Sequence, residues 1–274
     1  MNLSIFTTVS NPQERGDNWQ DAIDCYLDLA DELVVVDGNY TDPHPHEHGK
    51  LKIVDYKWEK EFSWEFIGQQ FQRGYEACTG DIVIHSDIDF IWHENNFTEI
   101  RKAAQDMVDR KLPAMSMWKH QFILPDRYNL KSRLVVMVNK KEFGDRIRFD
   151  SGGDLCQPSL DGIELKPDNV PEARIPFYCY EKLLKNEAQI KDDVGRMARA
   201  WQKYFGGYKL GGPDNEDAYK EWLHMSCGRF NKPQKHILLK EHPKYIQDTI
   251  SNLKPENWGW NGFNNLEKND YVQK

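Results

Sequence analysis

Long apolar runs, an internal repeat and an excess of positive charge are all missing from this sequence of 274 residues. No stretch approaches the roughly 18 consecutive apolar residues that a membrane-spanning helix needs, so we expect no membrane span. The net charge of -8 argues against a general nucleic-acid-binding protein. What remains is a polar chain whose 39% hydrophobic content is enough for a packed core.

Paired cysteines are missing as well. The chain has an odd number of scattered cysteines without a C-x-x-C motif, namely Cys25, Cys78, Cys156, Cys179 and Cys227. We interpret them as free thiols of a reducing compartment. The N-terminus runs directly into a strand-like segment, without the basic and apolar regions of a signal peptide. The sequence therefore predicts a cytoplasmic protein.

Apolar strand-like runs alternate with helical periodicity through the first 110 residues. The strand-like runs cover 3–9, 33–37, 51–56 and 82–84, and helical spacing covers 17–30, 63–78 and 94–110. Continuous apolar strands separated by helices are typical of a mainly parallel sheet with helices on both faces. The chain is therefore predicted to have an α/β fold. After residue 180, helical patterns dominate, which predicts a largely helical C-terminal extension.

Polar residues stand where the predicted strands end. Thr8 ends the first strand, Asp37 the second, and Asp87 and Asp89 follow the apolar run 82–84. Ligands of open α/β sheets bind at the carboxyl ends of the strands. On an extended chain, residues i and i+2 point to the same side, so the two acids of Asp87-Ile88-Asp89 need a cation between them. A divalent cation that bridges a diphosphate fits this need. A solvated turn is the structural alternative.

With these motifs the chain resembles a GT-A-fold glycosyltransferase of the family 2 type, of a divergent bacterial or phage kind. The resemblance covers about the first 140 residues. It rests on the first strand, on Leu33-Val-Val-Val-Asp37-Gly38, on Gln72-x-Gly74 followed by Gly80-Asp81, and on the D-x-D tripeptide. Family members usually carry VVDDGS at the second strand and Asn in place of Gln72. The resemblance implies a Rossmann-like GT-A core.

Carried over residue by residue, the resemblance implies a role for each strand-end residue. Thr8 would contact the nucleoside, and Asp37 would hydrogen-bond the uracil or the ribose. Asp87 would face the ribose or the metal, and Asp89 would ligate Mn²⁺ or Mg²⁺ on the donor diphosphate. Members also often use a C-terminal histidine as a third metal ligand. His242 is our first choice for it, with His224 and His236 as rivals.

An inverting transferase needs a general base for the acceptor hydroxyl. Asp154 lies in a Gly-Gly-Asp loop, where a ligand can approach the backbone closely. Asp217 belongs to a Glu-Asp pair that resembles the family's E-D motif, although this pair also suits a helix N-terminus. We predict Asp154 first and Asp217 second. Asp150 and Asp161 are further candidates.

The motifs and the resemblance together predict a metal-dependent glycosyltransferase of the hexosyl type. We expect it to invert the anomeric configuration, with retention as the alternative. It would move a sugar from a nucleotide-sugar donor, a UDP-sugar, to a carbohydrate or other small acceptor. Residues 1–180 would form the catalytic core, with a nucleotide-binding half at about 1–110 and an acceptor half at about 111–180. Residues 181–274 would form a helical extension packed on it. A nucleotidyltransferase and a non-catalytic carbohydrate-binding protein remain as alternatives.

Overall fold

The computed structural model describes residues 1–38, 48–58, 63–207, 211–230 and 235–260, and for 227–230 it describes the backbone alone. The chain divides into two compact units. The first consists of residues 1–12, 18–120 and 130–179. The second consists of residues 13–17, 121–129 and 180–274. Among the described helices, none is long and apolar enough to cross a membrane.

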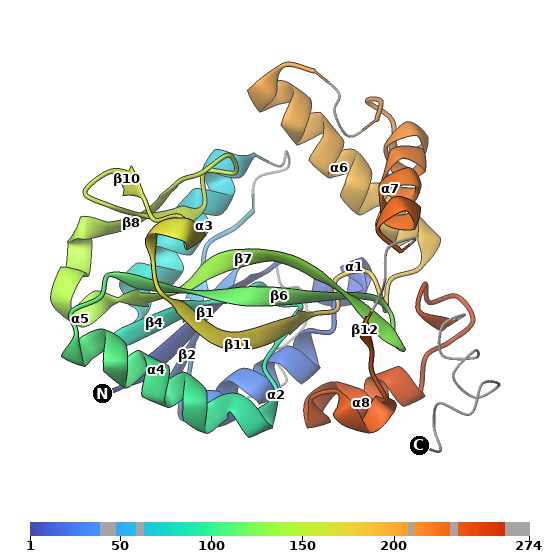
Figure 1. The fold of residues 1–274 in the computed structure, drawn as a ribbon. Coiled ribbons are helices and arrows are strands. Elements are labelled where there is room, and N and C mark those ends of the chain that lie inside the picture. Colours follow the sequence, from blue (N-terminus) through green and yellow to red (C-terminus); the bar gives the residue numbers. More distant parts are fainter. Residues whose placement is uncertain (39–47, 59–62, 208–210, 231–234, 261–274) are drawn as a thin grey trace. The chain divides into compact units, whose positions relative to one another are not determined.

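A large curled sheet forms the centre of the first unit (Figure 1). Its parallel part has the order β3-β2-β1-β4 and consists of β1 (Leu3–Val9), β2 (Glu32–Asp37), β3 (Leu51–Asp55) and β4 (Ile82–His85). The order continues through β7 (Arg127–Asn139), β6 (Ala114–Leu124), β11 (Glu172–Cys179) and β5 (Phe90–Ile91). β7 pairs antiparallel with β4, and β5 pairs antiparallel with β11. The predicted α/β fold is confirmed, with an antiparallel part added to the parallel one.

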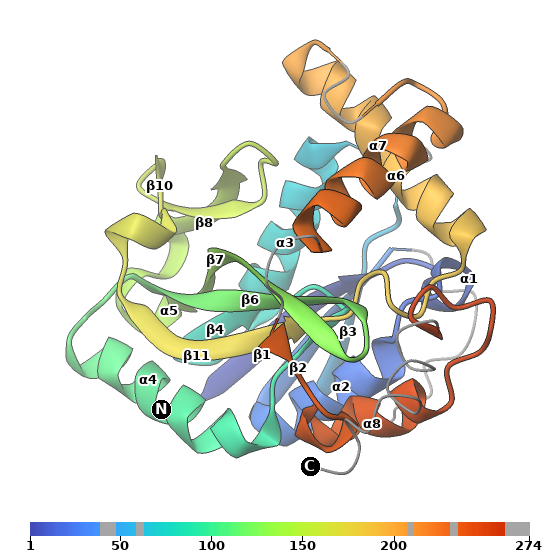
Figure 2. The ribbon, with the colours of Figure 1, turned by 45° about the vertical axis from the view of Figure 1, so that its right-hand side comes forward.

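Helices cover both faces of the parallel strands, which explains why β1, β2 and β4 are almost entirely buried. Helices α2 (Trp19–Leu29) and α4 (Phe97–Asp109) lie on one side, and α3 (Trp64–Ala77) lies on the other (Figures 1 and 2). Ser63 caps α3, because its side chain accepts a hydrogen bond from the Phe66 N–H at 3.2 Å. Residues 33–37 of β2 are all buried, as expected for a strand enclosed on both faces.

A small antiparallel sheet lies beside α3. It consists of β8 (Ile147–Ser151), β9 (Gln157–Leu160) and β10 (Ile163–Glu164). Phe149 of β8 packs edge-on against Phe6 of β1 and against Phe71 of α3, with ring centroids 5.3 and 6.1 Å apart. This aromatic core fixes the small sheet to the helix. Short elements complete the unit, namely α5 (Lys140–Phe143) and the 3₁₀ turns Glu94–Asn96, Gly144–Arg146 and Pro167–Asn169.

The second unit is mainly helical. Its elements are α6 (Glu187–Phe205), α7 (Asn215–Phe230), α8 (Lys244–Ser251), the 3₁₀ turn Leu239–Glu241 and the short strand β12 (Lys235–His236), while α1 (Pro12–Arg15) lies at its boundary. Helices α6 and α7 pack together through Ile190, Tyr219 and Trp222. A methyl group on Gly195 of α6 would lie 1.9 Å from the Asn215 side chain, so this glycine lets the start of α7 approach.

A buried ionic cluster stabilises the second unit. Lys185 is 1% exposed and lies 2.8 Å from an Asp17 oxygen and 2.5 Å from an Asp193 oxygen. Lys182 and Arg15 also pair with Asp193, at 3.1 and 3.7 Å. Burial by itself would raise the pKa of Asp193, but these three cations hold it well below its ordinary value. Asp193 is therefore a fixed negative charge at the centre of the cluster.

Candidate functional site

The carboxyl ends of adjacent parallel strands bring the predicted donor residues to one edge of the sheet. β1 lies between β2 and β4, and its register pairs Val9 with Asp37 and Phe6 with His85. Thr8 and Asp37 therefore end neighbouring strands, as the strand pattern predicted. Asp37 is 8% exposed and Thr7 is fully buried. Among the described residues, the Thr7 hydroxyl has no hydrogen-bond partner, so a buried polar group near this edge of the sheet is unsatisfied.

Asp87 and Asp89 lie in a turn beyond β4, and the expected extended geometry is wrong. The Phe90 N–H donates a hydrogen bond to the Asp87 carbonyl at 2.9 Å and closes this turn. Asp87 is exposed, whereas Asp89 is 7% exposed. The chain must bend here, because it leaves β4 in the middle of the sheet to enter β5 at the far end of the strand order. The turn thus separates one exposed carboxylate from one buried carboxylate.

Tyr26 of α2 holds this turn in place, which sequence reasoning did not foresee. Its hydroxyl donates toward the carbonyl oxygens of Asp87 and Phe90, at 2.7 and 2.6 Å, and accepts from the Ser86 hydroxyl at 2.7 Å. Burial raises the pKa of Tyr26 well above its usual value, so the hydroxyl keeps its proton. Tyr26 fits the apolar face of its helix, and nothing in that periodicity distinguishes a packing tyrosine from one that fixes a distant turn.

The pairing of β5 with β11 places a thiol beside Asp89. Cys179 lies opposite Phe90 in this antiparallel pair. Its sulfur lies 3.5 Å from an Asp89 carboxylate oxygen, and its side chain is fully buried. No sequence pattern predicted this neighbour, because Cys179 is only one of several scattered cysteines.

His85, the last residue of β4, lies in an aromatic environment. Its ring centroid is 5.6 Å from that of Phe71 and 5.4 Å from that of Phe149. Burial lowers the pKa of His85 to about 4, so the imidazole is neutral at pH 7. His85 therefore adds no positive charge beside Asp87 and Asp89.

Directly after β2, Gly38 packs against the side chain of Trp58. The Gly38 N–H donates to the Val9 carbonyl at 2.7 Å, and the Trp58 indole N–H donates to the same oxygen at 3.3 Å. A methyl group on Gly38 would lie 1.2 Å from the Trp58 ring, so only glycine allows this contact. Trp58 is half-buried and sits beside Asp37, which makes it a candidate aromatic surface for a base. Nothing in the sequence pattern distinguishes Trp58 from the other tryptophans.

The loop between β8 and β9 contains the first-choice base, Asp154. Among the described residues, its Oδ1 atom is buried and has no hydrogen-bond partner, while Oδ2 accepts from Gln157 at 3.4 Å. Burial raises the pKa of the Cys156 thiol, and the charges of Asp154 and Asp87 raise it further.

The rival acids have other contacts. Asp161 forms a two-pronged ion pair with Arg146, and Asp150 accepts a hydrogen bond from the Ser159 hydroxyl at 2.6 Å. Asp217 lies in the first turn of α7, where its backbone N–H donates to the Asp214 side chain at 2.8 Å. These contacts of Asp217 are those of a helix N-terminus.

His242 does not fit the predicted role of metal ligand. It is fully buried, and its Nε2 donates to the Pro125 carbonyl at 2.7 Å. Its Nδ1 therefore accepts the hydrogen bond from the Tyr180 hydroxyl at 2.8 Å. Both ring nitrogens are engaged, so neither offers a lone pair to an ion. The rivals His224 and His236 are exposed in α7 and β12.

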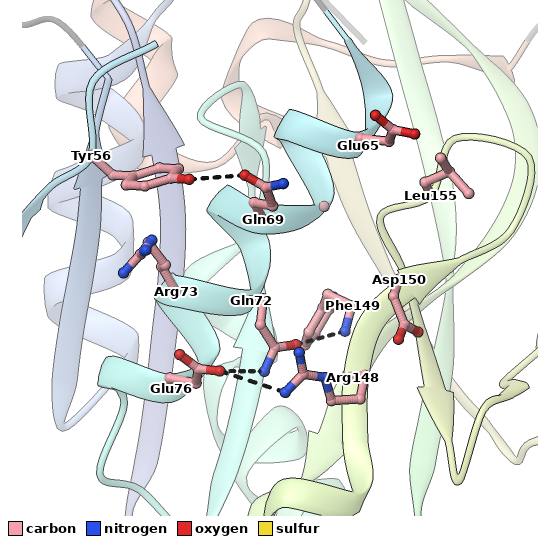
Figure 3. A pocket seen from close by; sticks show the side chains of 11 residues that line it. Tyr56, Glu65, Gln69, Gln72, Arg73, Glu76, Arg148, Phe149, Asp150 and Leu155 are labelled. Atoms are coloured by element: carbon pink, nitrogen blue, oxygen red, sulfur yellow. Dashed lines mark hydrogen bonds and ion pairs between the residues drawn. The ribbon is translucent and has the colours of Figure 1, made fainter. Parts of the chain in front are cut away.

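A separate open groove of about 420 Å³ runs between α3 and β8 (Figure 3). Its lining includes Gln69 and Gln72 from the helix and Asp150 from the strand. The Arg73 guanidinium lies 4.2 Å from the centre of the Tyr56 ring, and Phe66 stacks on the same ring. This aromatic ring is already used in packing, and none of the predicted donor residues lines the groove.

No protein-family model matches the chain, and no curated protein matches it. Similar solved structures include S. aureus TarS 1-349, with 12% identity, a TM-score of 0.41, and coverage of 84% of this chain and 74% of that chain. The mannosyltransferase PcManGT from Pyrobaculum calidifontis, in complex with GDP-Man and Mn²⁺, has 15% identity, a TM-score of 0.41 and coverage of 82% and 70%. Glucosyl-3-phosphoglycerate synthase from Mycobacterium tuberculosis, in complex with Mn²⁺ and UDP, has 17% identity and a TM-score of 0.30. This chain spans 44% of that synthase.

Proposed function

We propose that this protein is a metal-dependent glycosyltransferase that transfers a hexose from a UDP-sugar to the hydroxyl of a carbohydrate or other small acceptor. The observation that carries the proposal is the buried carboxylate of Asp89, held in a turn at the carboxyl end of β4. A buried acid beside a second acid, Asp87, is unfavourable unless a cation or a proton neutralises the pair. The D-x-D motif resembles that of the GT-A family, whose members bind a metal there, and this favours a cation over a proton.

The spacing of the strands suits a nucleoside diphosphate. Adjacent strands lie about 4.8 Å apart, so the ends of β2 and β4 lie roughly 10 Å apart across β1. Asp37 and Trp58 would hold the uracil and the ribose at the β2 side. The diphosphate would then extend past Thr8 toward Asp87 and Asp89. This assignment follows the roles that the sequence resemblance implies.

The acids fit a divalent cation. Carboxylate oxygens are the ligands that Mn²⁺ and Mg²⁺ prefer, and the exposed Asp87 gives an entry path to the buried Asp89. Asp87 and Asp89 would hold the ion. When bound, the ion would offset the negative charge that develops on the leaving diphosphate. Tyr26 would keep both carboxylates in position through the turn that it fixes.

Asp154 is the base of the proposed reaction. Its buried Oδ1 atom, which has no hydrogen-bond partner among the described residues, would accept the proton of the acceptor hydroxyl. The acceptor oxygen would bond to the anomeric carbon as the bond from that carbon to the diphosphate oxygen breaks. This direct displacement inverts the anomeric configuration. Asp217 remains the second candidate.

Calorimetry with UDP, GDP and CDP, each with and without Mn²⁺, tests the proposal. We expect UDP to bind only with the metal, and Asp89→Asn to abolish this binding. Asp109→Asn is the matched control, because Asp109 is an exposed acid of α4 that contacts Gln105. A folded protein that binds none of the nucleotides would contradict the proposal.

A donor screen and product analysis then test the finer assignments. Hydrolysis of one UDP-hexose in preference to others identifies the donor. The anomeric configuration of the product, measured by NMR, decides between inversion and retention. Asp154→Asn is expected to lower kcat about a hundredfold or more and to leave UDP affinity unchanged. If Asp217→Asn shows this pattern and Asp154→Asn does not, the base is Asp217.

A further inference from the structure

The contact between Asp89 and Cys179 is the feature of this site that the proposed function does not use. β11 ends at Cys179, and its register against β5 places the sulfur 3.5 Å from an Asp89 carboxylate oxygen. Both side chains are buried, with 7% of Asp89 and none of Cys179 exposed. The two side chains thus offer one oxygen and one sulfur to the same small volume.

The separation of these two atoms is that of two ligands on one ion. Metal–oxygen bonds of about 2.1 Å and a metal–sulfur bond of about 2.3 Å put the two ligand atoms about 3.1 Å apart at a right angle and about 3.6 Å apart at a tetrahedral angle. The observed 3.5 Å lies in this interval. An ion could therefore be bound between Asp89 and Cys179 with almost no movement of either strand.

We propose that Cys179 and Asp89 together ligate the divalent cation, and that the sulfur makes the site select Zn²⁺ or Co²⁺ over Mg²⁺. The inference rests on the metal site of the proposed function. Thiolate is a soft ligand that favours late first-row metals, whereas Mg²⁺ requires oxygen ligands. On binding, the sulfur exchanges its proton for the metal, and the proton passes to solvent.

Cobalt spectroscopy tests the proposal without any substrate. We expect Co²⁺ to give a thiolate-to-cobalt charge-transfer band in the near ultraviolet when added to the full-length, reduced protein. Cys179→Ser should lose this band and should bind Co²⁺ at least about tenfold more weakly in equilibrium dialysis. Asp89→Asn should lose the band too. Mg²⁺ should fail to displace Co²⁺ from the wild-type protein.

Cys25→Ser is the matched control. Cys25 is also fully buried in the first unit, but its thiol donates to the Trp92 carbonyl at 3.3 Å. The cobalt band should survive this substitution.

A bound cobalt ion without a charge-transfer band would overturn the proposal, because Cys179 would then act only as a hydrogen-bond donor to Asp89. That result needs the wild-type protein alone, so a misfolded variant cannot obscure it. It would also leave the glycosyltransferase proposal intact, since Asp87 and Asp89 could still hold the ion. Conversely, a cobalt band in a protein that binds no nucleotide would support the sulfur ligand and contradict the proposed function.

Discussion

Replacing Gly68 with alanine perturbs the contact that positions the Asp154 loop. Gly68 is a buried residue of α3, and an added methyl group would lie 2.3 Å from the Leu155 carbonyl oxygen and 3.1 Å from that of Phe149. Both atoms belong to backbone, so neither can rotate away as a flexible side chain would. Leu155 also has a φ of 55°, which limits how the loop can adjust. The helix and the loop must therefore separate.

Two opposing effects set the magnitude. Alanine stabilises a helix interior by about 0.5–1 kcal/mol relative to glycine. Forcing a methyl group into a packed site costs about 1–3 kcal/mol. Because the closest contact is well inside van der Waals distance, we expect the second effect to dominate. The free energy of unfolding of Gly68→Ala should fall by about 1–2 kcal/mol.

Urea denaturation measures this change, with Gly49→Ala as the control, since a methyl group on Gly49 would meet nothing within 4 Å. Under the proposed function, the displaced loop should also move Asp154. Transfer should then slow by the order of a hundredfold, while UDP affinity stays at the wild-type value. A Gly68→Ala protein that is as stable as the wild type, or more stable, would show that the helix and the loop accept the methyl group without separating.

Three further predictions concern buried polar groups. Burial lowers the pKa of His85 to about 4, compared with 6.5 in the unfolded chain. On acidification, His85 is therefore protonated in the unfolded state at a higher pH than in the folded state. The free energy of unfolding should therefore fall by about 3 kcal/mol between pH 6.5 and 4, and His85→Leu should lack this dependence in urea titrations. His242→Phe should lower the free energy of unfolding by about 2 kcal/mol or more, because it removes two buried hydrogen bonds, and it should leave metal affinity unchanged. Weaker metal binding by this variant would support His242 as a ligand. Asp193→Asn should lower the free energy of unfolding by about 3 kcal/mol in thermal or urea unfolding, because buried Lys182 and Lys185 then lose a shared negative partner and keep only Glu181 and Asp17. Asp161→Asn removes an exposed ion pair and should change the free energy of unfolding little. If Asp161→Asn and Asp193→Asn lower it equally, burial does not strengthen the contribution of Asp193.

Local patterns were sufficient to predict the elements that form the sheet edge. The apolar run 82–84 became β4, the run 33–37 became the buried part of β2, and the helix predicted at 63–78 is α3 with its Ser63 cap. These elements depend on residues that are neighbours in the chain. Once strands alternate with helices, the parallel order follows, and the polar strand ends must gather at one edge.

Contacts between distant residues decided the rest. The turn of Asp87 and Asp89 is fixed by a tyrosine hydroxyl more than 60 residues earlier in the chain. The sequence placed His242 near a metal, but packing engages its Nε2 with a carbonyl oxygen 117 residues away. Periodicity predicts whether side chains such as Tyr26 and His242 are buried, but it does not predict which polar atoms they bind by hydrogen bonds.

Periodicity and strand ends are local properties, so they were enough to predict the fold class and to place the two acids after β4. The burial of Asp89, the exposure of Asp87 and the 3.5 Å between Asp89 and Cys179 depend on long-range packing instead. The reason is the register of β5 against β11, which joins residues 90 positions apart. A shift of that register by one residue would turn the thiol to the other face of the sheet.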